Sequence, residues 1–263
     1  METRKDLKSY LINWIGGKRL LRKKIEPLLP QDIKIYIEPF GGGGWILFYK
    51  DKWASLEIYN DLDDRLVNLF RIVKYHPDEL VKEFRFMIAS RKMFHEALES
   101  TTYTDIQRAA KFLYLISRSF GGKGTHFGTA KKSSGGVKSQ QNILERINAI
   151  HKRLDKVLIE NLDFETLIIN YDREEAFFYC DPPYVTGENY YKTSKDGFDH
   201  ERLCSLLKNI KGRFLLSYDD NERIRELYKD FQIIEVERQK GINNKNPNGN
   251  VFKELLITNY RHG

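Results

Sequence analysis

The sequence has 263 residues, of which 41% are hydrophobic and 31% charged, a composition typical of a soluble globular protein with one domain or one domain carrying an insertion. No apolar run approaches the length of a membrane span, and the charged N-terminus lacks the apolar core of a secretory signal, so we expect a cytoplasmic protein without membrane contact. The net charge of +7 permits a polyanionic partner, while two cysteines without metal-ligand spacing argue against a disulfide scaffold and predict no metal site.

The N-terminal part of the chain alternates between predicted helix and predicted strand. Apolar residues at helical spacing predict helices at residues 18–29 and 63–73, and β-branched and aromatic runs predict strands at residues 35–38 and 55–59. Because ligands bind at the carboxyl ends of strands in an open α/β sheet, the residues that follow each strand are candidates for a binding site.

A glycine-rich segment, Glu38-Pro39-Phe40-Gly41-Gly42-Gly43-Gly44, follows the first strand and is expected to open a helix. Its glycines allow a ligand to approach the backbone, and Glu38 is placed to meet a cation such as the amino group of an amino-acid-like cofactor. The third glycine of a dinucleotide fingerprint would fall at Leu47, which disfavours that kind of site. A turn that only reverses the chain is the alternative.

Asn60-Asp61 follows the second strand, about twenty residues beyond the glycine-rich turn, where a carboxylate accepts the ribose hydroxyls of a nucleoside in many α/β sheets. Asp61 is our candidate for that contact. An aspartate near a helix start is more commonly only an N-cap, which is the competing interpretation.

Between about residues 65 and 153 the pattern becomes helix after helix, with predicted helices at residues 78–89, 91–99, 105–118 and 141–152. We interpret residues 65–153 as a helical insertion into a sheet domain formed by residues 1–64 and 154–263. Within it, residues 118–141 contain no acidic side chain and are rich in glycine and serine. This stretch either approaches a phosphate backbone or is merely solvated. Its candidate DNA-binding residues are Arg118, Lys123, His126, Lys131, Lys132 and Lys138.

The alternation resumes after the insertion, with strands at residues 157–160, 176–180 and 213–217 and helices at residues 164–170, 200–208 and 221–229. The final strands, at residues 232–237 and 252–258, are joined by a segment rich in Gly, Asn and Lys that lacks helical spacing, which predicts an antiparallel hairpin. The predicted fold class is therefore α/β, with seven mostly parallel strands, a C-terminal antiparallel hairpin and a helical insertion.

The strongest chemical motif is the tetrapeptide Asp181-Pro182-Pro183-Tyr184, directly after the apolar strand at residues 176–180. Its prolines hold the backbone extended, so that it displays a carboxylate, a carbonyl and an aromatic ring. An exocyclic amine on a base is a poor nucleophile, and acceptors for both its N–H bonds, from Asp181 and the Pro182 carbonyl, would favour a more nucleophilic nitrogen. Tyr184 would stack on a base swung out of a duplex. A turn with a packed tyrosine is the alternative.

Taken in order, these motifs resemble the Dam-type DNA adenine-N6 methyltransferases, the D12 class or alpha group. Trp14-Ile15-Gly16-Gly17-Lys18 is similar to the family's W-A-G-G-K segment, and Glu38-Pro39-Phe40 with Gly42 and Gly44 is similar to its E-P-F-x-G-x-G loop. Asn60-Asp61 resembles the N-D pair, Asp163-Phe164 the D-F dipeptide, and residues 181–184 the D-P-P-Y motif. Leu216-Ser217-Tyr218-Asp219 is a looser match to the S-N-H-D segment.

The resemblance implies a Rossmann-like, S-adenosylmethionine-dependent methyltransferase that transfers a methyl group to N6 of a flipped-out adenine in double-stranded DNA by direct displacement. The insertion at residues 65–153 would be its target-recognition domain. The implied catalytic residues are Asp181, Pro182, Pro183 and Tyr184. The implied cofactor contacts are Trp14, Lys18, Glu38, Phe40, Gly42, Gly44, Asp61, Asp163, Phe164 and Asp181. Without the resemblance, Trp14 would be interpreted as an interfacial aromatic and Lys18 as a cation at a helix N-terminus.

Two departures from the family pattern fall at places that help to read DNA. Asn13 precedes Trp14 where a basic residue is common, and Arg118-Ser119-Phe120-Gly121-Gly122 is one residue shorter than R-x-G-[FY]-N-G and lacks its asparagine. The resemblance therefore does not carry over a GATC target. A cognate restriction endonuclease and the oligomeric state stay open.

Four other interpretations compete with adenine methylation. Cytosine-C5 methylation is disfavoured because it needs an accessible cysteine nucleophile, and Cys180 lies inside an apolar strand. Cytosine-N4 methylation and a catalytically inactive DNA-binding protein on the same fold are the alternatives that stay open. Methylation of RNA or of protein amides is a further one. The long basic insertion favours duplex nucleic acid over a protein substrate, and methyl transfer to DNA but not to RNA would separate the two nucleic acids.

Overall fold

A computed structural model describes residues 10–14, 16–128, 139–185, 197–239 and 251–261. The described residues form two compact units, the first within Met1–Lys18, Gly42–Lys52 and Asp63–Asn161, and the second within Arg19–Gly41, Trp53–Leu62 and Leu162–Gly263. None of the helices in these ranges has the length and apolar content needed to cross a bilayer.

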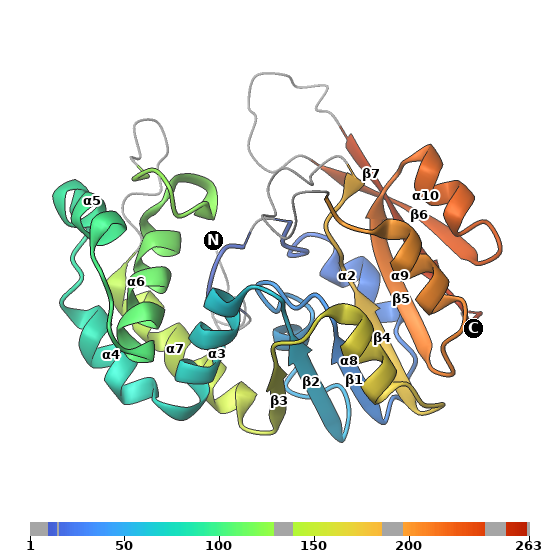
Figure 1. Ribbon diagram of the computed structural model, residues 1–263, viewed down its shortest axis with the longest axis horizontal. Helices are drawn as coiled ribbons and strands as arrows, with labels where there is room; N and C mark the ends of the chain where they lie inside the picture. The colour runs from blue at the N-terminus through green and yellow to red at the C-terminus, as the bar shows by residue number, and fades with distance from the viewer. Residues whose placement is uncertain (1–9, 15, 129–138, 186–196, 240–250, 262–263) are drawn as a thin grey trace. The chain divides into compact units, whose positions relative to one another are not determined.

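The seven predicted strands are confirmed in the described chain. They are β1 (Ile35–Glu38), β2 (Leu56–Asn60), β3 (Val157–Glu160), β4 (Ala176–Cys180), β5 (Arg213–Asp219), β6 (Gln232–Gln239) and β7 (Val251–Thr258). They form one sheet in the order β3-β2-β1-β4-β5-β7-β6 (Figure 1). The pairs β1–β2, β1–β4 and β4–β5 are parallel, whereas β5–β7 and β6–β7 are antiparallel, which confirms the mostly parallel sheet with a C-terminal hairpin.

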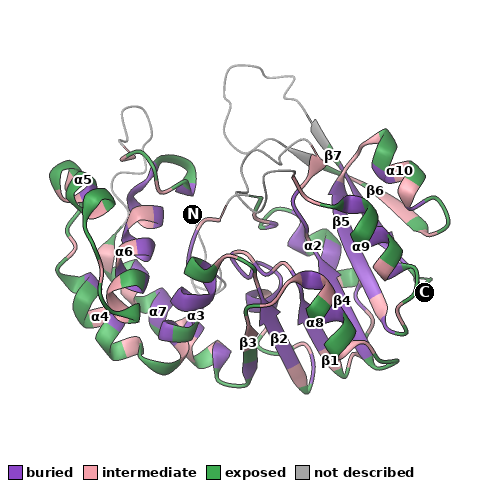
Figure 2. Ribbon diagram, in the orientation of Figure 1, coloured by how far each residue is buried: buried purple, intermediate pink, exposed green. Residues whose placement is uncertain are grey.

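In the second unit, the alternation of side chains along the strands separates two buried faces. One face packs against α8 (Phe164–Tyr171), α9 (His200–Leu207) and α10 (Glu222–Leu227), and its strand residues include Ile37 and Phe178. On the other face, the Tyr36 ring stacks on Phe177 at a centroid distance of 6.1 Å. β4 is buried along its whole length (Figure 2), as expected of a central parallel strand covered on both faces.

The first unit contains the helix predicted at residues 63–73 and the four helices predicted after it, up to residue 152. They are α3 (Asp64–Tyr75), α4 (Pro77–Arg85), α5 (Arg91–Glu99), α6 (Asp105–Arg118) and α7 (Gln140–Leu154). Ser90 and Thr104 cap α5 and α6, accepting hydrogen bonds from the backbone N–H groups of Met93 and Gln107. Such caps typically contribute about 0.5–2 kcal/mol each. Phe70 from α3, Phe84 from α4 and Leu113 from α6 lie in the buried core of this unit.

Two helix predictions were wrong in extent. The helix expected at residues 18–29 is a single turn, α2 (Arg22–Ile25), followed by the 3-10 helix η1 (Glu26–Leu28), because Pro27 has no backbone N–H to continue the α-helical ladder. The glycine-rich turn opens no α-helix and leads instead to the 3-10 helix η2 (Leu47–Tyr49). Gly42 and Gly44 adopt φ angles of 50° and 66°, which a right-handed helix does not accommodate.

Candidate active site

The carboxyl ends of the parallel strands in the second unit bring the predicted motifs to one edge of the sheet. Glu38 ends β1, which pairs with both β2 and β4. Asn60 ends β2, Asp181 follows β4, and Asp219 ends β5. Ligands bind at this edge in open α/β sheets, so the register places these four polar residues at the edge where a ligand is expected.

Hydrogen bonds join the two functional side chains of the tetrapeptide to residues from β5 and β7. The Ser217 hydroxyl donates to Asp181 Oδ1 over 2.9 Å, which orients the carboxylate. The Tyr184 hydroxyl donates to Glu254 Oε2 over 3.0 Å and lies 3.5 Å from Ser217 Oγ. Ser217 is fully buried and Glu254 is 2% exposed. Burial and the carboxylates of Asp181 and Glu254 raise the pKa of Tyr184 well above its usual value, so its hydroxyl stays a donor.

Three residues next to these two side chains in the sequence are buried. Pro182 and Pro183 are both buried. Cys180, at the end of β4, is fully buried, and burial raises the pKa of its thiol far above the ordinary range. A thiol of this kind is protonated at neutral pH and is no nucleophile, in agreement with its predicted place inside the strand.

The buried Asn60 amide ties two of the predicted motifs together. Its Nδ2 donates to the carbonyls of Pro39 and Leu162 over 2.9 and 3.0 Å, and its Oδ1 accepts from the Leu162 backbone N–H over 2.8 Å. The loop after β1 is thereby fixed beside the segment that leads to Asp163. The N-cap of α3 is Asp63, not Asp61, so capping does not account for the partly exposed Asp61.

Three phenylalanine rings form a cluster, and one of them, Phe164, directly follows Asp163 in the sequence. Phe40, Phe164 and Phe198 lie with ring centroids 5.4–5.5 Å apart. Asp163 caps α8 through the Glu165 backbone N–H and accepts a hydrogen bond from Arg202 over 2.9 Å. A set of aromatic faces beside a carboxylate suits a purine with an exocyclic amine.

Glu38 is a second buried carboxylate at this edge. It is 2% exposed, and the Tyr36 hydroxyl donates to its Oε1 over 2.7 Å. A buried carboxylate needs hydrogen-bond donors or a cation, and Glu38 therefore suits a cationic amino group as a further partner.

The remaining cofactor candidates belong to the first unit, where the Trp14 side chain packs on the glycine-rich turn. A Cβ added to Gly42 would lie 3.0 Å from the Trp14 ring. A Cβ added to Gly44 would lie 2.3 Å from the Phe48 ring, so both positions require glycine. Lys18 is 4% exposed, and its Nζ donates to the Gly16 carbonyl over 3.0 Å.

The candidate DNA-binding residues differ in how accessible they are. Lys123 and His126 are exposed in a turn closed by the bridge between Ser119 and Phe127. Arg118 is only 5% exposed, and burial lowers the pKa of its guanidinium. The other three predicted residues, Lys131, Lys132 and Lys138, lie outside the described residues.

Sequence reasoning missed several residues of this edge. Ser217 appeared only as part of a loose motif match, and no role was predicted for Glu254, Phe198 or Arg202. The one available indication was that Glu254 directly precedes the apolar run Leu255–Ile257 of the last strand. No group of His, Cys, Asp and Glu suited to a metal ion occurs among the residues that the structure describes.

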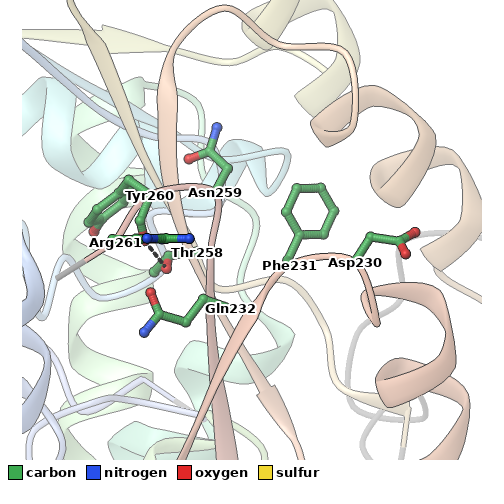
Figure 3. Close-up of a pocket in the computed structure, with 7 residues that line it drawn as sticks. All are labelled: Asp230, Phe231, Gln232, Thr258, Asn259, Tyr260 and Arg261. Atoms are coloured by element: carbon green, nitrogen blue, oxygen red, sulfur yellow. Dashed lines mark hydrogen bonds between the residues drawn. The ribbon is translucent and has the colours of Figure 1, made fainter.

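A surface hollow of about 350 Å³ lies at a different place in the second unit (Figure 3). It borders the start of β6 and the end of β7, at the amino end of β5, and therefore at the edge opposite the tetrapeptide. It contains none of the predicted site residues. Its lining residues are Asp230, Phe231, Gln232, Thr258, Asn259, Tyr260 and Arg261.

The fold and the edge of the sheet define the class of protein. A seven-stranded sheet with a C-terminal antiparallel hairpin and an Asp-Pro-Pro-Tyr motif after a central strand defines an α/β methyltransferase. The model of the D12 class N6 adenine-specific DNA methyltransferase family matches residues 14–242, and the chain belongs to this family. Its enzymatic activity is accordingly adenine methylation, and its substrate is DNA.

Several curated proteins are similar over nearly their whole length. The type II methyltransferase M1.LlaDCHI of Lactococcus lactis subsp. cremoris is 29% identical, with 94% of each chain covered. The type II methyltransferase M.MjaIII of Methanocaldococcus jannaschii is 28% identical, with 97% of this chain and 100% of the relative covered. A DNA adenine methylase of Haemophilus influenzae is 26% identical, with 93% and 91% covered. These comparisons confirm the predicted family and the adenine-specific reaction.

Proposed function

We propose that this protein transfers a methyl group from S-adenosylmethionine to N6 of an adenine extruded from a specific site in duplex DNA. The observation that carries the proposal is the arrangement of the tetrapeptide, in which Ser217 orients the Asp181 carboxylate and Glu254 holds the Tyr184 hydroxyl. An acceptor and a stacking ring in fixed positions are what an exocyclic amine on a base requires.

The chemistry of the side chains at the sheet edge fits S-adenosylmethionine. Glu38 suits its amino group, Asp61 its ribose hydroxyls, and Asp163 with the phenylalanine cluster its adenine. The family resemblance adds the residues of the N-terminal segment and the glycine-rich turn. The proposed cofactor contacts are therefore Trp14, Lys18, Glu38, Phe40, Gly42, Gly44, Asp61, Asp163, Phe164 and Asp181.

S-adenosylmethionine supplies an electrophilic methyl group on a sulfonium when it is bound. The chain's own part is to hold the adenine amine so that its lone pair faces that methyl group, with the amine protons donated to Asp181 and to the Pro182 carbonyl. The Asp181 carboxylate would stabilise the positive charge that develops on the adenine nitrogen during methyl transfer and would accept the proton that this nitrogen loses. No covalent enzyme intermediate is needed.

Tyr184 would compensate for the loss of stacking that extrusion costs. Extruding a base costs a few kcal/mol, and stacking on an aromatic ring returns about 1–3 kcal/mol per base. Because the Tyr184 hydroxyl is held by hydrogen bonds, its ring is already oriented before a base arrives.

For DNA binding, we propose residues 65–153 as the target-recognition insertion, with Lys123, His126, Lys131, Lys132 and Lys138 toward phosphates. The exposed Lys123 and His126 support this assignment. We propose Arg118 as a further contact of the same stretch, with less of its side chain available to a phosphate because it is only 5% exposed. Since two of the relatives are named type II methyltransferases, we also propose a cognate restriction endonuclease.

The test is to incubate the purified protein with unmethylated duplex DNA and methyl-labelled S-adenosylmethionine, digest the DNA to nucleosides and identify the labelled one. Label in N6-methyldeoxyadenosine is expected, and mapping the modified positions gives the target site. Label in N4-methyldeoxycytidine would overturn the base assignment. Single-stranded DNA and RNA are offered in parallel reactions. If the protein binds the cofactor but places no label on DNA, the proposed reaction is wrong.

A further inference from the structure

Glu254 is a carboxylate buried in the middle of the C-terminal antiparallel strands. It lies on β7, opposite Asp219 of β5 and Val236 of β6, and is 2% exposed. The three residues that follow it, Leu255 to Ile257, are all fully buried and apolar. A buried carboxylate destabilises the fold unless hydrogen bonds compensate for its lost hydration. We therefore expect Glu254 to make an interaction that an apolar residue at this position could not make.

The hydrogen bond from Tyr184 is such an interaction. The Tyr184 ring packs against the Tyr218 ring at a centroid distance of 5.9 Å, and its hydroxyl donates to Glu254 Oε2 over 3.0 Å. The Tyr184 side chain is therefore held by a contact between the two rings and by the hydrogen bond of its hydroxyl. Because burial and the nearby carboxylates keep the phenol protonated, this bond persists across the pH range of an enzyme assay.

We propose that Glu254 is a positioning residue for base extrusion, which holds the Tyr184 ring in the orientation in which it stacks on the extruded adenine. This inference rests on the proposed function, since it requires that Tyr184 contacts the base. Ser217 lies between the two anchored groups, 3.5 Å from the Tyr184 hydroxyl and 2.9 Å from Asp181 Oδ1. Through this chain of contacts the hairpin strand β7 fixes the stacking ring in register with the carboxylate that receives the amine.

Variants can distinguish a positioning role of Glu254 from a purely structural one, because positioning requires a hydrogen-bond acceptor at residue 254. Glu254→Gln keeps an acceptor oxygen at the same place, whereas Glu254→Leu keeps the volume and removes the acceptor. Tyr184→Phe keeps the ring and removes the donor. Glu57 is a matched control, since it is also a buried glutamate of the second unit, 3% exposed, and accepts the Trp53 backbone N–H over 2.8 Å. It lies near the amino end of β2, whereas the candidate site lies at the carboxyl ends of the strands.

The experiment measures base extrusion with duplex DNA that carries 2-aminopurine at the adenine identified by methyl mapping, together with kcat and KM on the unsubstituted duplex. We expect Glu254→Leu and Tyr184→Phe each to weaken the fluorescence-detected extrusion by about threefold to tenfold, the size of one lost hydrogen bond. Glu254→Gln should stay within about twofold of the unaltered protein, and Glu57→Gln should not differ from it.

A combination of two variants shows whether Glu254 acts through Tyr184. If it does, Tyr184→Phe with Glu254→Leu is no worse in extrusion than either change alone, because both remove the same bond. Fully additive losses would overturn the proposal, as would normal extrusion in a folded Glu254→Leu protein, or a Glu254→Gln protein as impaired as Glu254→Leu.

Folding and function are controlled separately. Thermal melting and cofactor binding report whether each variant folds. If Glu254→Leu does not fold, the Tyr184→Phe protein tests the proposal instead. Normal base extrusion by Tyr184→Phe would show that the hydrogen bond has no positioning role. Failure of the proposed function would appear differently, as an unaltered protein that places no label on adenine.

Discussion

Asp181 and Cys180 are neighbours in sequence but have opposite chemical environments. The Cys180 thiol faces the apolar cluster beneath α8 and α9, whereas the Asp181 carboxylate accepts a hydrogen bond from Ser217 at the edge of the sheet. Successive side chains at the end of a strand point to opposite faces, so the change from core to site occurs within one residue. The group that a ligand at the edge of the sheet can reach at this position is therefore the carboxylate.

We expect Asp181→Asn to reduce methyl transfer by at least about a hundredfold, the typical loss when a group that stabilises developing charge is removed. Asn keeps the shape and one acceptor oxygen but removes the negative charge that the methylated amine requires. Ser217→Ala should cost less, about twofold to tenfold, because it removes only the bond that orients Asp181. Rates with labelled cofactor at saturating DNA measure both, and an Asp181→Asn protein with normal turnover would contradict the mechanism.

Cys180→Ala should retain methyl transfer within about threefold, since burial raises the pKa of the thiol and leaves it protonated at neutral pH. The folded protein should likewise keep its activity after treatment with a thiol-alkylating reagent. Loss of transfer in a Cys180→Ala protein with an unchanged melting temperature and cofactor affinity would show that the thiol takes part in the reaction.

At the scale of elements, an ion-pair network joins α10 to the C-terminal strands. Arg225 donates to Asp220 over 2.6 Å at the end of β5, and to Glu235 on β6 over 2.6 Å. These bonds connect the short helix to the end of the strand that precedes it, β5, and to the strand that follows it, β6. Because Ile224 is the one residue of α10 that is buried, we expect the ion pairs of Arg225 to help hold this helix against the strands.

The hydrogen bond and charge of Arg225 lower the pKa of Asp220 below its ordinary value of 3.8. A lowered folded-state pKa stabilises the native state above the ordinary pKa, and that stabilisation is lost as the pH falls through the lowered value. Asp220→Asn should therefore reduce the melting temperature by about one to three degrees at neutral pH. Thermal melts should show the difference between the two proteins shrinking as the pH falls below 3.8, and a difference that does not shrink on acidification would refute the assignment.

At the scale of the whole molecule, the net charge of +7 matches a polyanionic substrate. The basic stretch of the insertion contributes to it without any acidic residue to offset it. Counterion release on binding phosphate makes this charge visible as a salt dependence of DNA affinity.

Lys123→Ala should reduce the slope of log affinity against log salt by about 0.9, the value for one lost phosphate contact. Exposure in the turn after α6 is the basis for choosing this residue. Lys229→Ala is the matched control, because Lys229 is also exposed but pairs with Glu226 over 2.7 Å in the second unit. Equal slopes for the Lys123 variant and the control would show that the turn does not contact phosphate.

The sequence by itself determined the strands, most of the helices and the motif at the end of β4. These follow from patterns within a few residues: a period of two or of 3.6, proline and glycine as breakers, and polar residues directly after apolar runs. Even the shortened α2 has a local cause in Pro27, which the apolar spacing alone concealed.

Only the tertiary structure decided which distant residues support the site. Glu254 lies 70 positions from Tyr184, Asn60 lies 102 from Leu162, and Ser217 lies 36 from Asp181. No local pattern specifies such pairs, because they depend on the strand order β4-β5-β7 and its register, which arise when the whole sheet buries its apolar faces.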